Sequence, residues 1–475
     1  MRLLSPRFEL GRDVKVGRGG RVIVGGQPVR AIRLTPAGIR LVDGALQGTL
    51  GEIGRAEKSL IDRLVRAGLL NPLPEPSAGA GERTTVIIPA LDEAESIGQL
   101  VATVLPTVFE VIVVDDGSTD GTAEAAGSAG ARVIRHERSR GPGASRNTAS
   151  IATGTELIAF LDADCLAPSS DWIERLAGHL NLPGVVLVAP RIVGAGPTEC
   201  GRSTDLIAEY ERDSCPLDMG VRPSVAGRGK SVPFVPSAAM LIDRAALVEA
   251  GGFAEELRYG EDVDLVWRLS ENGMLCRYEP AVIVKHRSRS GIAAFARQRF
   301  HYGASAVALD RRHPGAVAPF HGSLTGFGVA LANPYAGLLP VAASSLLGAR
   351  RLTRAGGPLS GRQGFAIAMG GGLNSVITLN RGLAREWLPF TIAAAFSRRL
   401  RRFVLWALVG LVVDEAKRPA ATFLPSLALG GIARASYAAG LWSASVKSRR
   451  LAPLLPTLGV KRKSVVDQDR PAGLK

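Results

Sequence analysis

Between residue 84 and about residue 310, short apolar runs alternate with stretches of helical periodicity. Apolar runs of this length, bounded by turn residues and separated by amphipathic stretches, are typical of an α/β fold with a largely parallel sheet. The predicted strands are TTVIIPAL, EVIVVDD, ARVIRH, TELIAFLDAD, VVLVAPRIV and AVIVKH. The predicted helices between them are ESIGQLVATVL, GTAEAAGSA, GASRNTASIAT and DWIERLAGHL.

The first 73 residues have a different pattern and end in the linker NPLPEPSAGAGER. GGRVIVGGQPVRAIR predicts two short strands across a glycine-containing turn, followed by a helix that begins at Thr35 and Pro36. GTLGEI and EKSLIDRLVRAGLL predict two more helices, the last ending at Gly68. This order indicates a winged-helix-like module that resembles the PqqD-like domains, which hold precursor peptides. We expect peptide binding rather than DNA binding, because no helix carries a dense basic row; a purely structural appendage is the third alternative.

From about residue 317, long uncharged segments are broken by arginine clusters. HGSLTGFGVALANPYAGLLPVAASSLLGARR is long enough to span a bilayer, which needs about 20 residues, but it contains Gly, Pro and Asn. Two shorter apolar pieces flank RRLRR further on. We expect a membrane-associated helical region that either spans the bilayer or lies in its interface, and a soluble helical bundle is the alternative.

Charge and cysteine content narrow the choice of partner and compartment. The chain has 58 Lys and Arg against 43 Asp and Glu, a formal net charge of +15. This balance suits nucleotide phosphates, nucleic acid or an anionic membrane surface. The four cysteines form no CxxC pair, and the start MRLLSPRFELGRD has no apolar leader. We therefore expect attachment to the cell membrane with the folded domain on the cytoplasmic side, and we expect no nucleic acid.

Acidic side chains follow three of the predicted strands at the point where each strand ends. They are Asp92 and Glu93, Asp115 and Asp116, and Asp162 and Asp164. Open α/β sheets bind their ligands at the carboxyl ends of strands, where an ionised carboxylate can accept hydrogen bonds from uracil or ribose. Asp162 and Asp164 point to the same side of an extended segment, so their mutual repulsion indicates a metal between them. In GPGASRN, Arg146 is expected on a flexible basic turn suited to phosphates.

The motifs PALDE, VVDDGSTDGT, GPGASRN, LDADC and GEDVDLVWRL, in this order and spacing, resemble those of the family-two glycosyltransferases of the GT-A fold. The whole chain is most similar to the branch of this family that serves mycofactocin systems. The resemblance implies a GT-A (Rossmann-like) nucleotide-sugar domain at residues 84–310. A winged-helix-like module would precede it at residues 1–73, and a hydrophobic helical region would follow at residues 317–475.

The implied reaction is an inverting, metal-dependent transfer of glucose from UDP-glucose to a small peptide-derived acceptor, building a short β-linked oligoglucoside. The alternative is a membrane-associated family-two enzyme that acts on a lipid or cell-envelope polysaccharide. Gln298 is followed by Arg299, Phe300 and His301, so the Q-x-x-R-W box of processive synthases is not reproduced. A binding protein without catalysis would leave the acidic strand ends without a purpose. A nucleotidyltransferase would carry a Gly-rich basic signature that IIPALDEAES does not show.

The resemblance also implies roles for single residues. Asp162 and Asp164 would hold Mn²⁺ or Mg²⁺ against the donor diphosphate, and His286 is either a third ligand or a packed histidine. Asp262 is the expected general base, whereas Glu261 has only the acidity usual at a helix N-terminus. The expected donor contacts are Pro89, Glu93, Asp115, Asp116, Arg146, Asp162 and Arg299.

Overall fold

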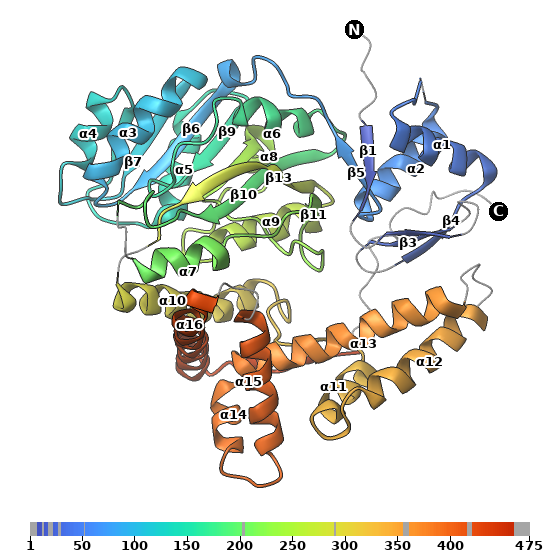
Figure 1. The fold of residues 1–475 in the computed structure, drawn as a ribbon. Coiled ribbons are helices and arrows are strands. Elements are labelled where there is room, and N and C mark those ends of the chain that lie inside the picture. Colours follow the sequence, from blue (N-terminus) through green and yellow to red (C-terminus); the bar gives the residue numbers. More distant parts are fainter. Residues whose placement is uncertain are drawn as a thin grey trace. The chain divides into compact units, whose positions relative to one another are not determined.

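The chain forms two compact units, residues 1–298 and 299–475, and helix α10 (Ile292–Arg312) runs across the division (Figure 1). The computed structural model describes residues 7–11, 14–17, 22–26, 30–51, 53–201, 205–288, 291–354, 361–415 and 420–459. The N-terminal module and the α/β domain lie together in the first unit. The three boundaries expected from the sequence stay predictions.

An eight-stranded sheet forms the centre of the first unit, in the order β11-β13-β10-β12-β9-β6-β7-β8. Its strands are β6 (Thr84–Ala90), β7 (Glu110–Asp115), β8 (Arg132–Arg135), β9 (Leu157–Leu161), β10 (Val185–Gly194), β11 (Ser224–Ala226), β12 (Ala239–Asp243) and β13 (Leu275–His286). Strands β9, β6, β7 and β8 pair in parallel, as do β10 and β13. Strand β12 is antiparallel to both β9 and β10, and β11 is antiparallel to β13.

All six predicted strands are present, but the sequence prediction missed β11 and β12. The expectation of a largely parallel sheet was therefore wrong in one respect, because an antiparallel strand lies between the two parallel groups. The run Ala239–Asp243 is short, uniformly apolar and directly followed by a helix. Periodicity cannot distinguish such a run from the start of a buried helix.

Helices cover both faces of this sheet (Figure 1). They are α3 (Ala94–Val104), α4 (Thr122–Ser128), α5 (Pro142–Ala152), α6 (Trp172–Leu180), α7 (Leu206–Ser214), α8 (Arg244–Glu249) and α9 (Glu261–Glu271). Successive strand residues enter opposite cores: Val86 and Ile88 pack on one face, and Ile87 on the other. Burial on both faces explains why these strands read as continuous apolar runs. The four helices predicted between the strands are confirmed.

The N-terminal module contains the predicted hairpin and two of the three predicted helices. Its elements are β1 (Arg7–Leu10), β2 (Lys15–Val16), β3 (Val22–Gly25), β4 (Arg30–Arg33), α1 (Pro36–Gln47), α2 (Arg55–Arg66) and β5 (Leu70–Leu73). Thr35 caps α1 by accepting from the Gly38 N–H at 3.1 Å. The helix expected at GTLGEI is wrong for its described residues: Gly48, at φ 68°, ends α1, and Gly54 precedes α2. Pairing of β1 with β5 was not foreseen.

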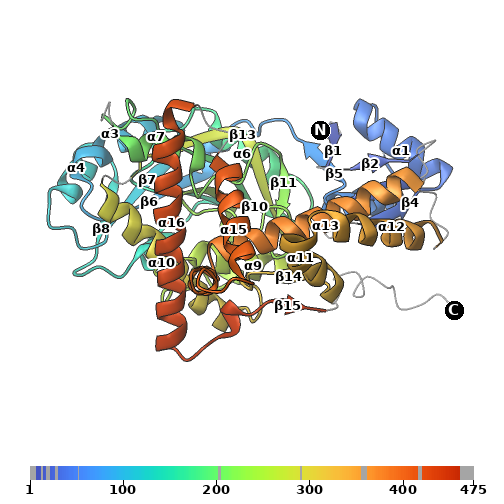
Figure 2. The same cartoon turned by 60° about the horizontal axis from the view of Figure 1, so that its bottom comes forward.

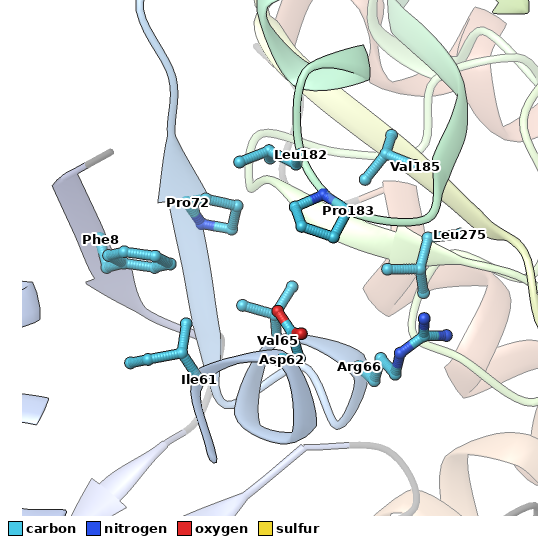
Figure 3. Close-up of a pocket in the computed structure, with 10 residues that line it drawn as sticks. All are labelled: Phe8, Ile61, Asp62, Val65, Arg66, Pro72, Leu182, Pro183, Val185 and Leu275. Carbon is cyan, nitrogen blue, oxygen red and sulfur yellow. The ribbon is translucent and has the colours of Figure 1, made fainter. Parts of the chain in front are cut away.

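The module contacts the α/β domain through α2 and β5. Arg66 donates to the Gly273 carbonyl at 2.8 Å, and Asn71 donates to the Pro223 carbonyl at 3.2 Å. A mostly apolar pocket lies beside these contacts (Figure 3). It is lined by Phe8, Ile61, Asp62, Val65, Arg66, Pro72, Leu182, Pro183, Val185 and Leu275.

The second unit is mainly helical (Figure 2). After α10 come β14 (His321–Gly322), α11 (Leu324–Ala336), α12 (Leu339–Arg354), α13 (Gly361–Ala384), α14 (Leu388–Ala394), α15 (Arg401–Glu415), α16 (Ala420–Lys447) and β15 (Thr457–Leu458). Its largest core joins residues of α11, α12 and α13 to Phe320 and Trp387. Among the described residues, no helix combines the length and the apolar character that crossing a bilayer requires.

Candidate active site

Asp162 and Asp164 lie directly beyond the carboxyl end of β9, whose five residues are all buried. Their side chains are 28% and 27% exposed, whereas Ala163 between them is 4% exposed. Both carboxylates are therefore partly exposed beside a buried alanine. The segment is a turn, closed by the Cys165 N–H donating to the Asp162 carbonyl at 3.0 Å, and not the extended chain that the sequence predicted; that the two carboxylates share one face stays a prediction. The Asp162 N–H donates to the Ala238 carbonyl at 2.9 Å, just before β12 begins. The antiparallel strand that the sequence did not reveal thus fixes this pair of aspartates.

Each of these aspartates contacts a cationic or titratable partner. Arg146 NH2 lies 2.6 Å from Asp162 Oδ1, and His286 Nε2 lies 3.1 Å from Asp164 Oδ1. Burial alone would lower the pKa of His286, but Asp164 and Asp162 raise it to about 9. The end of β13 is held in place because the Arg287 N–H donates to the Asp164 carbonyl at 2.9 Å. His286, expected either as a ligand or as a packed histidine, is placed beside Asp164.

Arg146 also binds Glu261, whose expected role was the ordinary acidity of a helix N-terminus. NH1 of Arg146 lies 2.7 Å from Glu261 Oε1, and the guanidinium is 5.4 Å from the centre of the Phe253 ring. Both side chains are almost fully buried, at 2% and 8% exposure. Burial and the neighbouring Asp262 raise the pKa of Glu261 to about 7, against the opposing effect of Arg146. The structure therefore links the aspartate pair to the start of α9 through one guanidinium.

The segment around Arg146 differs from the flexible basic turn that was expected. Pro142 occupies the first turn of α5, and Arg146 lies well inside this helix. Asn147 fixes the chain before α9, since its amide accepts from the Phe253 N–H at 2.8 Å and donates to the Phe253 carbonyl at 2.9 Å. The predicted helix GASRNTASIAT therefore includes Arg146. The flexible turn expected for this residue was wrong, because helix formation and ion pairing bury its side chain.

Asp262 lies beside the same group. Its Oδ2 accepts from the Ser237 N–H at 3.2 Å, and its Oδ1 accepts from the Val263 N–H at 2.7 Å. Burial raises the pKa of Asp262 above the usual range of an aspartate. Because Ser237 holds Asp262 and the adjacent Ala238 holds Asp162, two consecutive residues fix both acids.

Asp264, two positions further on, is fully buried and has a structural contact. Its Oδ2 lies 2.7 Å from Arg268 Nε, one helical turn away. Arg268 NH2 donates in turn to the Gly252 carbonyl at 2.6 Å. This pair ties α9 to the loop before it, which is a structural role for Asp264.

The acids after β6 and β7 build the neighbouring loops. Asp92, at φ 56°, accepts from the Thr119 N–H at 2.8 Å, and the Glu93 N–H donates to Thr122 Oγ1 at 2.8 Å. Asp115 is fully buried, accepts from the Ser118 N–H at 2.8 Å and lies 3.3 Å from Arg135 Nε. A positive φ in a residue other than glycine is uncommon and concentrates at functional sites. The hydrogen bonds of Asp92 and Glu93 to Thr119 and Thr122 join the loops after β6 and β7 into one continuous surface, which is called the wall below.

Asp116 is surrounded by donors from its own chain. Its Oδ1 lies 2.7 Å from His136 Nδ1 and 2.9 Å from the Arg140 N–H, and its Oδ2 accepts from Ser139 Oγ and the Gly141 N–H, both at 2.8 Å. Burial would raise the pKa of Asp116, but these hydrogen bonds hold it below the usual range. Four donors fill the two lone pairs of each oxygen. For Asp116 to contact the nucleotide sugar as predicted, one of these four hydrogen bonds would have to be replaced by a bond to that ligand.

Two further residues are predicted to contact the nucleotide-sugar donor. Pro89 is inside β6, paired with Val114 of β7. Arg299 belongs to the second unit, where its guanidinium lies 5.8 Å from the centre of the Tyr302 ring. Their roles stay predictions.

The aspartate pair fits a divalent cation that is completed by substrate. Among the described residues, no three His, Cys, Asp or Glu side chains converge into a metal site formed by protein alone. Mg²⁺ and similar hard ions commonly take one or two carboxylates and draw their other ligands from phosphates and water. Asp162 and Asp164 supply such carboxylates. His286 as a third ligand stays a prediction, because its Nε2 is paired with Asp164 and its raised pKa favours the protonated ring, which has no lone pair at that nitrogen for a metal.

Similarities to known proteins include a family model, a curated relative and a solved structure. Residues 85–247 match the family model described as glycosyl transferase family 2. The pre-mycofactocin glycosyltransferase of Mycobacterium tuberculosis is 34% identical over 470 residues, which are 95% of this chain and 97% of that protein. Mannosyltransferase PcManGT from Pyrobaculum calidifontis, solved with GDP-Man and Mn²⁺, is a remote structural neighbour, with a TM-score of 0.39 and 19% identity over 76% of this chain and 89% of that one.

Proposed function

The chain belongs to the family-two glycosyltransferases, enzymes that use nucleotide sugars. We propose that it transfers glucose from UDP-glucose to the precursor of a peptide-derived redox cofactor. The product would be a short β-linked oligoglucoside on a mycofactocin precursor. One observation carries this proposal: the similarity to a pre-mycofactocin glycosyltransferase extends over 95% of the chain. It therefore includes the N-terminal module and the helical region, and is not limited to the sugar-nucleotide domain.

Donor binding is assigned to the wall formed by the β6 and β7 loops and to the aspartate pair. Asp162, Asp164 and His286 would hold a Mn²⁺ or Mg²⁺ ion. When bound, this ion neutralises negative charge that develops on the leaving diphosphate. Arg146 orients Asp162, because its guanidinium lies 2.6 Å from the Asp162 carboxylate.

Asp262 is the proposed general base. Burial raises the pKa of Asp262 towards neutral pH, and a general base is most efficient when its pKa is near the pH at which the enzyme works. Asp262 would take the proton from the acceptor hydroxyl while that oxygen attacks the anomeric carbon. A single in-line attack inverts the configuration at this carbon. Glu261 is bound by Arg146, so we assign it to positioning the start of α9.

The N-terminal module is the proposed docking site for the peptide-derived acceptor. Its sheet β2-β3-β4 has β2 and β4 at its edges. An extended peptide can pair with a sheet edge through main-chain hydrogen bonds. The module also lies in the same compact unit as the aspartate pair, which would keep a bound acceptor near the chemistry.

Mass spectrometry of purified enzyme reactions tests the proposal. The protein would be incubated with Mn²⁺, the peptide-derived precursor and either UDP-glucose or GDP-mannose. We expect a ladder of hexose additions with UDP-glucose and little product with GDP-mannose. Transfer to a lipid extract but not to the precursor would support the lipid or polysaccharide alternative. Release of pyrophosphate from a nucleoside triphosphate would contradict the assignment to sugar transfer.

A further inference from the structure

Helices α14 and α15 form a hairpin (Figure 1). Its turn exposes apolar and basic side chains together. Phe396, in the turn, is 89% exposed, and Phe390 and Ile392 on α14 are 61% and 57% exposed. Water-exposed aromatic and aliphatic side chains gathered on one element indicate an interaction surface.

The outer face of α15 continues this apolar surface. Leu405, Leu408, Val409, Val412 and Val413 follow the spacing of one helical face and are 41–62% exposed. The opposite face is packed: Ala407 is 5% exposed, and a Cβ on Gly410 would lie 1.6 Å from Asn380 Oδ1 of α13. The helix therefore has one face fixed to its own unit and one apolar face in solvent.

Four exposed arginines lie at the N-terminal end of this apolar face: Arg398, Arg399, Arg401 and Arg402. No ion pair of these four is found among the described residues. The nearby Tyr335 of α11, 48% exposed, donates from its hydroxyl to the Arg399 carbonyl at 2.8 Å and lies under the Arg402 guanidinium at 5.4 Å. The acids at the other end of α15 are paired, with Asp414 Oδ2 lying 2.9 Å from Arg434.

We propose that the α14–α15 hairpin docks on an anionic membrane surface. Phe396 and the outer face of α15 would enter the boundary between headgroups and acyl chains, and the four arginines would bind lipid phosphates. Charge complementarity selects this partner, because a basic cluster beside an apolar helical face is the composition of interfacial helices. The net charge of +15 acts in the same direction. Attachment from one side also requires no helix that crosses the bilayer.

Vesicle co-sedimentation of the full-length protein tests this inference. Vesicles of phosphatidylcholine would be compared with vesicles that also contain phosphatidylglycerol. We expect binding to the anionic vesicles, and a loss on the order of a hundredfold to a thousandfold when Arg398, Arg399, Arg401 and Arg402 are all replaced by Gln. The matched control replaces Arg33, Arg40, Arg55 and Arg63, four exposed arginines of the N-terminal module, and should bind as the wild type does.

A second pair of variants tests insertion of the apolar turn. Phe396→Ser should weaken binding to anionic vesicles severalfold, whereas Phe109→Ser, at a position 63% exposed in the α/β domain, should not. Phe396→Trp should give a blue-shifted emission on vesicles, because the indole leaves water.

Three results would overturn the inference: no vesicle binding by the wild-type protein, equal binding by both arginine variants, or a concentration-dependent dimer that Phe396→Ser dissociates. The inference is independent of the proposed reaction. Hexose transfer from UDP-glucose to a soluble acceptor, measured with the wild-type protein in the absence of vesicles, tests the proposed reaction separately from membrane binding.

Discussion

The guanidinium of Arg146 lies between Asp162 and Glu261, which belong to elements distant in the chain. At 2% exposure it cannot be solvated, so its charge depends on these two carboxylates. Removing one member of such a buried group leaves an uncompensated charge. The residues around it have separable roles that single substitutions can test.

The metal assignment predicts that Asp164→Ala abolishes sugar transfer and weakens Mn²⁺-dependent UDP binding, because one of the few protein ligands is lost. Titration calorimetry with UDP, with and without Mn²⁺, checks this apart from turnover. Asp171→Ala, an exposed aspartate without a side-chain capping bond, is the matched control. Unchanged Mn²⁺-dependent binding in Asp164→Ala would remove this residue from the metal site.

The base assignment predicts that Asp262→Asn lowers kcat by on the order of a hundredfold to ten-thousandfold. UDP-glucose binding should stay near normal, because the amide keeps the shape of the side chain. The raised pKa of Asp262 also predicts an acid limb in the wild-type rate profile that lies above the range of an ordinary aspartate. A parallel fall of donor affinity and rate would instead make Asp262 a binding residue.

The buried ion pairs predict that Arg146→Met destabilises the fold by about 3–5 kcal/mol, since Glu261 and Asp162 lose their cation. Urea denaturation measures the change. The double variant Arg146→Met with Glu261→Gln should recover part of the loss, because the buried acid is replaced by a neutral group. No recovery in the double variant would mean that the two side chains are not coupled.

At the scale of elements, α5 determines where α9 begins. Asn147, beside Arg146, makes two hydrogen bonds to the main chain of Phe253 in the loop that leads to α9. The packing is close, since a Cβ on Gly252, at φ 71°, would lie 2.6 Å from Asn147 Oδ1. A short side chain on one helix thus positions the acidic end of another.

Asn147→Ala is therefore predicted to cost about 1–3 kcal/mol of folding stability, because main-chain groups of Phe253 lose their partners. Transfer should also slow, since Asp262 would be less firmly placed. Asn147→Asp keeps the acceptor for the Phe253 N–H but places a carboxylate oxygen beside the Phe253 carbonyl and Glu255, so it should not restore the lost stability. Denaturation midpoints and kcat measured for both variants decide the point, and equal stability of Asn147→Ala and wild type would contradict it.

At the scale of the whole molecule, stability is expected to depend on pH through buried groups outside the active site. His179 on α6 is 2% exposed, and its Nε2 lies 3.0 Å from Glu279 Oε2 of β13. Burial lowers the pKa of His179 from its usual 6.5, although Glu279 partly opposes this. The unfolded chain therefore takes up the proton more readily than the folded one.

Folding stability contributed by His179 should thus be complete above pH 6.5 and be lost as the pH falls towards its folded pKa. Urea denaturation midpoints of the wild type and of His179→Gln, each measured at pH 7.5 and 5.5, check this. The readout is the difference between the two proteins in the stability lost between these pH values. We expect the wild type to lose more stability on acidification than the variant. Identical losses would exclude His179 as the source.

The strands and the acids that follow them could be predicted from the sequence, because apolar periodicity and turn residues act within a few positions. The six strands, the four helices between them and the cap at Thr35 are all local features. The antiparallel β12, the pairing of β1 with β5 and the burial of Glu261 were not predictable in this way. Each depends on partners far away in the chain, and no local pattern specifies a partner.

The same distinction between local features and distant partners applies to the residues of the active site. The sequence by itself determined which acids lie at strand ends and, through its motifs, the family. Only the tertiary structure decided that Arg146 joins Asp162 to Glu261 and that Ser237 and Ala238 hold Asp262 and Asp162. It also decided that the Asp116 carboxylate accepts its hydrogen bonds from nearby residues of its own chain. A carboxylate becomes a base, a ligand or a structural acceptor according to the charges and donors within a few ångströms of it. Those neighbours are brought together by folding, whereas the sequence supplies only the acid.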